Sequence, residues 1–205
     1  RWRHADIPPA APRRASAKPP WVMERDRHIS DEHTMIARRQ YAAAIEVIDD
    51  MIGEILTALE RSGQAENTYI VFVSDHGEML GDLERYAKEE PYEPSLHVPL
   101  IACGPGIPSG RTSDALVELI DLNPTICELA GLHGQPNLDA RSFSGVLRDP
   151  ARDHRSETVS AIRGWRCVRT DRYKLVHFHS LETGELYDLS ADVGESRDLS
   201  GYLPE

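Results

Sequence analysis

The chain has 205 residues, with 34 acidic and 23 basic side chains and a formal net charge of −11. This length can bury a sizeable core, as one large domain or one and a half. The negative charge argues against nucleic acid or an anionic membrane as the main partner, because both attract basic surfaces, but it does not exclude a small anionic substrate.

The N-terminal third predicts an irregular lead followed by one long helix. Residues 1–30 carry closely spaced prolines, which prevent both a helix and a central strand. From about residue 31 to 62, apolar side chains recur at three- and four-residue steps and predict an amphipathic helix that stops at Gly63. No apolar run in the chain is long enough to span a bilayer.

A short apolar strand then runs into a polar loop. Residues 69–73 (YIVFV) are typical of a strand buried on both faces, as in the middle of a parallel sheet. Asp75 and His76 follow directly, and ligands of open α/β sheets bind at the carboxyl ends of strands. An Asp-His pair alone is more often a capped turn, but its position also suits a metal or an anion.

The rest of the chain predicts a second strand, a helix and a small sheet. Residues 98–103 form the strand, and residues 121–132 form the helix, with Asp121 or Asn123 as its cap. Short alternating runs at 163–178 and 186–189 favour an antiparallel meander. The cysteines, Cys103, Cys127 and Cys167, have neither disulfide nor metal-ligand spacing and are expected to be buried thiols.

These elements predict an α/β fold: part of a mixed, mostly parallel sheet flanked by helices, with a small C-terminal antiparallel sheet. The expected organisation is an irregular segment over 1–30, the α/β part over 31–147 and the antiparallel subdomain over 148–205.

Several segments together resemble the sulfatase family of the alkaline phosphatase superfamily. They are 74–82 (SDHGEMLGD), Lys88 and 92–101 (YEPSLHVPLI), flanked by 41–45 (YAAAI), 121–125 (DLNPT), 170–175 (TDRYKL) and 184–189 (GELYDL). The match covers nearly everything from about residue 32 onward. The Asp75-His76 pair is closest to the branch of phosphonate monoester hydrolases and choline sulfatase-like enzymes.

The resemblance implies roles for four side chains. Asp75 and His76 match the ligands of a divalent metal, calcium by family, although imidazole also suits manganese or zinc. Lys88 matches a catalytic lysine that contacts the sulfuryl oxygens and so binds substrate. His97 takes a substrate-binding position that is arginine in many relatives.

The resemblance also shows what this chain lacks. The paired aspartates that complete the metal site, and the Cys- or Ser-x-Pro-x-Arg motif that yields the formylglycine nucleophile, are not in it. We therefore interpret the chain as the C-terminal portion of a hydrolase of small sulfate esters. The alternatives are a phosphonate monoester or phosphodiester hydrolase of the same superfamily and a catalytically inactive truncated domain. Self-association is expected if the portion exposes an apolar sheet edge.

Overall fold

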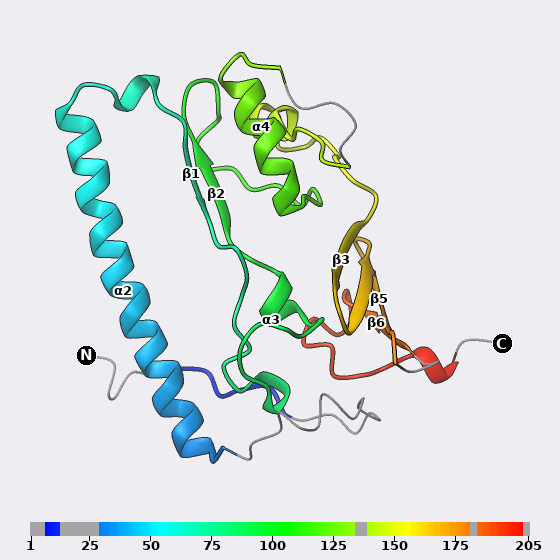
Figure 1. Ribbon diagram of the computed structural model, residues 1–205. Helices are drawn as coiled ribbons and strands as arrows, with labels where there is room; N and C mark the ends of the chain where they lie inside the picture. The colour runs from blue at the N-terminus through cyan, green and yellow to red at the C-terminus, as the bar shows by residue number, and fades with distance from the viewer. Residues whose placement is uncertain (1–6, 13–28, 134–138, 181–183, 203–205) are drawn as a thin grey trace.

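The computed structural model describes residues 7–12, 29–133, 139–180 and 184–202. A long helix stands on one side, a two-stranded ribbon runs beside it, and a four-stranded sheet lies on the other side (Figure 1). Within the predicted irregular segment, residues 7–12 form neither helix nor strand, and most of the remainder lies outside the described residues. The α/β class is confirmed, and so is the small antiparallel sheet.

The predicted long helix is α2, which spans Asp31–Arg61. The Ser30 side chain accepts a hydrogen bond from the His33 amide at its start, and Gly63, with φ of +70°, follows its end. Much of its apolar face is exposed, including Ile45, Ile48 and Ile55. No helix in the described ranges is long and apolar enough to cross a membrane.

The ribbon differs from the predicted buried parallel strand. Strand β1 (Ile70–Val73) pairs antiparallel with β2 (Leu100–Cys103). Phe72 is 40% exposed and Ile101 63% exposed, so burial on both faces is wrong for the described structure. The apolar run predicts a strand correctly, but it carries no information on the direction of the neighbouring strand. Every strand pair among the described residues is antiparallel.

The short helices occupy the connections. They are the 3-10 turns η2 (Ala65–Asn67), η3 (Asp82–Glu84), η4 (Leu119–Asp121) and η5 (Ser200–Tyr202) and the helices α3 (Glu93–Leu96), α4 (Leu122–Leu129) and α5 (Ser144–Arg148). Helix α4 confirms the predicted helix, and Gly131 follows it with φ of +72°. Asp121, one of the two expected caps, is the N-cap residue of α4, but its carboxylate makes no capping hydrogen bond and instead accepts from Arg155.

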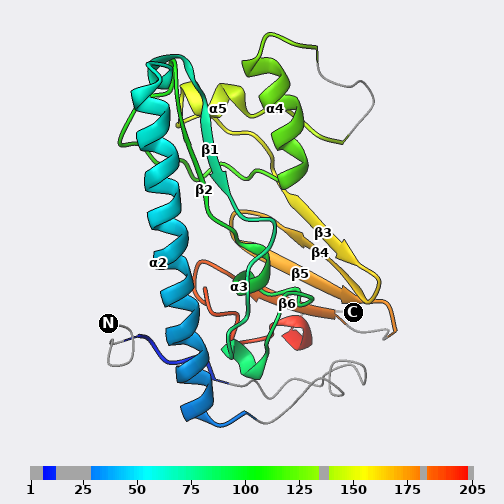
Figure 2. The ribbon, with the colours of Figure 1, turned by 60° about the vertical axis from the view of Figure 1, so that its left-hand side comes forward.

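The C-terminal sheet has the order β3-β4-β5-β6, with each strand antiparallel to the next. Its strands are β3 (Thr158–Ile162), β4 (Trp165–Arg169), β5 (Tyr173–Phe178) and β6 (Gly184–Asp188). Figure 2 shows the sheet lying beside α3. Cys167 is buried on its inner face, whereas Cys103 is exposed and Cys127 is half-buried, so the expectation of three buried thiols is wrong.

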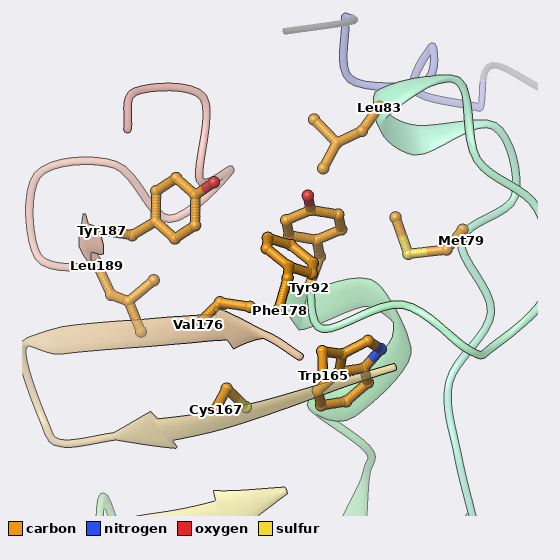
Figure 3. Packing of buried hydrophobic residues seen from close by; sticks show 9 residues of the cluster. All are labelled: Met79, Leu83, Tyr92, Trp165, Cys167, Val176, Phe178, Tyr187 and Leu189. Carbon is orange, nitrogen blue, oxygen red and sulfur yellow. The ribbon is translucent and has the colours of Figure 1, made fainter. Parts of the chain in front are cut away.

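The main apolar core lies between this sheet and the loop that follows β1. The loop and the start of α3 contribute Met79, Leu83 and Tyr92, and the sheet and its exit contribute Trp165, Cys167, Val176, Phe178, Tyr187 and Leu189. In Figure 3 these side chains meet between the two segments. Because Met79 and Val176 are both fully buried, this contact fixes the loop to the sheet.

Candidate functional site

Asp75 and His76 lie just beyond the end of β1, as predicted. The Asp75 side chain is 85% exposed, and its Oδ1 accepts a hydrogen bond from the His76 amide at 3.0 Å. The His76 Nδ1 lies 2.8 Å from the Gly77 carbonyl oxygen. Because a carbonyl can only accept, Nδ1 carries the proton, and Nε2 of the neutral ring is left with its lone pair.

Lys88 reaches this lone pair from twelve residues further along. Its Nζ donates to His76 Nε2 at 2.7 Å, and Asp75 Oδ2 lies 3.5 Å from the same Nε2. An ammonium, an imidazole and a carboxylate therefore gather at the strand end. His76 Nε2 is the atom that both the Lys88 ammonium and the Asp75 carboxylate approach.

The loop between His76 and Lys88 is closed by one carboxylate. Glu78 Oε1 accepts from the Leu80 amide at 3.2 Å and from the Ala87 amide at 2.6 Å. Four non-glycine residues here have left-handed backbones: Leu80, Leu83, Glu84 and Ala87. Each such conformation costs roughly 1–3 kcal/mol and persists only where the surroundings enforce it. The buried Leu83 and the Glu78 clamp supply that constraint.

Helix α3 connects the two sides of the site. The Ser95 carbonyl accepts from the Gly77 amide at 2.8 Å, and the Ser95 hydroxyl donates to the Lys88 carbonyl. Gly77 is required for this approach, since a Cβ there would overlap the Pro94 carbonyl oxygen. The buried Ser95 therefore holds the backbone beside His76 and the backbone of Lys88 at the same time.

His97 belongs to the other end of α3. Its side chain is 75% exposed, and its Nδ1 lies 3.4 Å from Glu93 Oε2. His97 and the three side chains Asp75, His76 and Lys88 line the same open hollow, of about 2140 Å³. This volume exceeds that of an ordinary ligand pocket and indicates an open face rather than an enclosed cavity.

The donor set fits part of a metal site. The Asp75 carboxylate and the His76 lone pair are ordinary ligands, and the Nδ1 hydrogen bond to a carbonyl is how ligating histidines are usually oriented. In the described part of the chain, however, no cluster of three or more His, Cys, Asp or Glu side chains could hold a metal.

Sequence reasoning missed the residues that support the site. The side chains of Ser95 and Glu78 bind backbone groups of other residues, and no sequence pattern marks such contacts. Lys174 occupies an inward position of β5, where alternation predicts an apolar side chain. Glu195 lies in a loop, 102 residues from the Glu93 amide that it binds.

Family models match the chain over residues 9–132 (Sulfatase) and 81–202 (N-sulphoglucosamine sulphohydrolase, C-terminal). The first match alone covers more than half of the chain. The chain therefore belongs to the sulfatase family.

Individual relatives agree with this assignment. Arylsulfatase K of Xenopus laevis is 32% identical over 184 residues, which are 82% of this chain and 34% of that protein. N-acetylglucosamine-6-O-sulfatase of Bacteroides thetaiotaomicron is 32% identical over 177 residues, covering 80% and 32% of the two chains. The chain thus spans about a third of the length of these curated relatives.

Solved structures extend the likeness to the fold. The protein BT4656, in complex with its substrate D-glucosamine-2-N,6-O-disulfate, has a TM-score of 0.78 and 29% identity, covering 83% of this chain and 37% of that one. The phosphonate monoester hydrolase of Silicibacter pomeroyi has a TM-score of 0.77 and 30% identity, covering 86% and 39%.

Proposed function

We propose that the full-length protein hydrolyses sulfate monoesters and that this chain supplies Asp75, His76 and Lys88 to its reaction centre. The observation that carries the proposal is the meeting of Lys88 Nζ with the His76 lone pair beside the Asp75 carboxylate. The sulfatase family match over residues 9–132 includes all three side chains, which supports the proposal.

Lys88 is the catalytic and substrate-binding candidate. Cleavage of the S–O bond places negative charge on the departing alcohol oxygen and on the sulfuryl oxygens, and a fixed ammonium stabilises that charge. Its three N–H donors are not held in one plane, so it can follow these oxygens as the bond lengthens. His97, exposed at the edge of the same hollow, is the second substrate-binding candidate.

Asp75 and His76 are the candidate metal ligands. A bound divalent metal would supply a Lewis acid, and the formylglycine that the resemblance implies would supply the nucleophile from outside this chain. Because Nε2 has a single lone pair, it would hold either a metal or the Lys88 N–H. With a metal bound, the Lys88 ammonium would be available to ester oxygens. Calcium is expected by family, with manganese or zinc as the alternatives that His76 favours.

A phosphonate monoester or phosphodiester hydrolase is the second candidate. The phosphonate monoester hydrolase of Silicibacter pomeroyi is 30% identical and covers 86% of this chain. Tetrahedral anions of similar size can use the same donors. The third candidate, a catalytically inactive domain, applies to this chain by itself, because two ligands and a lysine include no nucleophile.

The test compares kcat/KM for three classes of ester and measures the effect of replacing Lys88. The full-length protein is assayed on an aryl sulfate, an aryl phosphonate monoester and an aryl phosphodiester. We expect the sulfate to have the highest kcat/KM, and Lys88→Met to lower it by about 10²- to 10³-fold. Arg172→Met, which removes an exposed cation from the C-terminal sheet, is the matched control and leaves kcat/KM unchanged. A preference for the phosphonate would favour the second candidate, and full activity of Lys88→Met would refute the role of Lys88.

A further inference from the structure

Lys174 is a cation buried on an apolar face. It lies on the inner side of β5 with Val176 and Phe178, and its side chain is 0% exposed. Burying an ammonium is costly unless it is paired. The groups that pair with the Lys174 ammonium must therefore compensate for its burial.

Two carboxylates surround the Lys174 ammonium. Glu195 Oε1 lies 2.7 Å from its Nζ and Glu93 Oε1 lies 3.1 Å away. Glu195 is itself fully buried and has a left-handed backbone, with φ of +49°. Its other oxygen, Oε2, accepts from the Glu93 amide at 2.8 Å. Lys174 of the sheet therefore holds the side chain of Glu93, the first residue of α3, and Glu195 of the loop after β6 holds its backbone amide.

Helix α3 links Glu93 to the candidate site through hydrogen bonds. Two residues after Glu93, Ser95 bonds to the amide of Gly77 and to the carbonyl of Lys88. The sheet makes a second contact with the same segment, because the Trp165 indole N–H donates to the Glu89 carbonyl at 3.0 Å. Both backbone segments that carry the site are thus fixed from the C-terminal sheet.

We propose that Lys174 is a positioning residue for the candidate site: by holding Glu93 it fixes α3, and through Ser95 it sets the spacing between His76 and Lys88. The inference rests on the proposed function in so far as that spacing governs ester hydrolysis. Removing Lys174 leaves Glu93 with two more exposed partners. Arg169 Nε lies 3.5 Å from Oε1, with a side chain that is 26% exposed, and His97 Nδ1 lies 3.4 Å from Oε2, with a side chain that is 75% exposed. Glu93 would then be drawn toward solvent, and α3 with it.

The experiment uses the full-length protein. Lys174→Met alone leaves Glu195 buried without its cation and can prevent folding, so the main variant is Lys174→Met/Glu195→Gln. The glutamine side chain of this double variant retains an oxygen that can accept from the Glu93 amide. Arg172→Met is the control, because it breaks an ion pair to Asp188 that is 2.7 Å long and exposed on the Arg172 side.

Two readouts are measured. The first is hydrogen exchange at the Gly77 amide, which is bonded to Ser95, and at the Ala130 amide in the last turn of α4 as an internal reference. We expect exchange at Gly77 to quicken on the order of tenfold in the double variant, with Ala130 unchanged. The second is turnover, for which kcat should fall about 10- to 100-fold while KM changes little. Arg172→Met should change neither readout.

The outcomes separate this inference from the proposed function. If the wild-type protein hydrolyses no ester, the proposed function fails, and hydrogen exchange alone decides whether Lys174 positions α3. Unchanged exchange at Gly77 in the double variant overturns the inference. Equal acceleration at Gly77 and Ala130 also overturns it, because this would mean general loosening. If the protein is active and the Gly77 amide exchanges faster in the double variant, an unchanged kcat also overturns the inference.

Discussion

The imidazole of His76 presents one nitrogen lone pair to a cation, held in that direction by the Nδ1 hydrogen bond to Gly77. Oxygen ligands suit calcium and magnesium, whereas imidazole favours manganese or zinc. In the proposed site, His76 would therefore favour manganese or zinc over calcium.

Replacing His76 tests this preference. In the full-length protein, His76→Asn should weaken manganese and zinc binding relative to calcium, because an amide oxygen replaces the ring nitrogen. Isothermal titration of the chelator-treated protein with each metal alone measures the change. His97→Asn, at the exposed end of α3, is the control and should leave the order of affinities unchanged. An unaltered order in His76→Asn would exclude His76 as a ligand.

Asp121 is the best-connected buried carboxylate described. Burial alone would raise its pKa, but hydrogen bonds from Arg155, from the Arg141 and Glu118 amides and from His154 outweigh burial and lower the pKa from 3.8 to about 2. It therefore joins η4 and α4 to the segment at 154–155 that leads into the C-terminal sheet. The ionised Asp121 carboxylate therefore stabilises the folded state.

Asp121→Asn should lower the free energy of unfolding by about 3 kcal/mol at neutral pH, since the largely buried Arg155 loses its nearest charged partner and keeps only Glu118, whose Oε2 lies 3.3 Å away. Because the folded pKa lies below the ordinary value, the wild-type stabilisation is present above about pH 4 and lost as pH falls through about 2. The two proteins should therefore converge in acid, as followed by denaturant unfolding. Asp188→Asn removes a carboxylate whose pKa Arg172 also lowers to about 2, and it should change stability little because its partner Arg172 is 60% exposed. A constant difference across this pH range would contradict the assignment.

At the scale of elements, the contact of α3 with the Asp75-His76 loop depends on one glycine. Gly77→Ala places a Cβ against the Pro94 carbonyl oxygen, so α3 must shift and the Gly77–Ser95 hydrogen bond must lengthen. We expect a lower melting temperature and at least about tenfold lower kcat. Gly53→Ala is the matched control: it lies inside α2 with open space around it and should stabilise by about 0.5–1 kcal/mol. Wild-type turnover in Gly77→Ala would refute the requirement.

These elements also show how far sequence reasoning reaches. The apolar period predicts α2 almost to its last residue, because helix formation follows local spacing. The antiparallel pairing of β1 with β2 depends instead on the path of residues 74–99, where several non-glycine residues take left-handed backbones that no pattern announces. The family resemblance is what predicts a shared site for Asp75, His76 and Lys88. The buried Lys174 escapes prediction because only tertiary contacts show why a lysine occupies an apolar position.

At the scale of the whole molecule, one side of the described structure is apolar and uncovered. Along α2, Ile45 is 52% exposed, Ile48 50% and Ile55 66%, and on the ribbon Phe72 and Ile101 are also exposed. Exposed apolar patches of this kind mark surfaces that bind other protein surfaces. This chain spans only about a third of the length of its curated relatives, so the rest of such a protein could cover this surface.

The 205-residue chain produced by itself should therefore self-associate, because two copies can bury these apolar surfaces against each other. Light scattering across a concentration series is expected to give a mass that rises above the 23.0 kDa of one copy. Ile48→Glu/Ile55→Glu should return the mass toward that of a monomer, since both positions lie on the exposed face of α2. Val193→Glu is the control: Val193 is 74% exposed on the C-terminal loop, and its replacement should leave association unchanged. A wild-type chain that remains monomeric at every concentration would show that this apolar side is stable in water, and association through it would have to be abandoned.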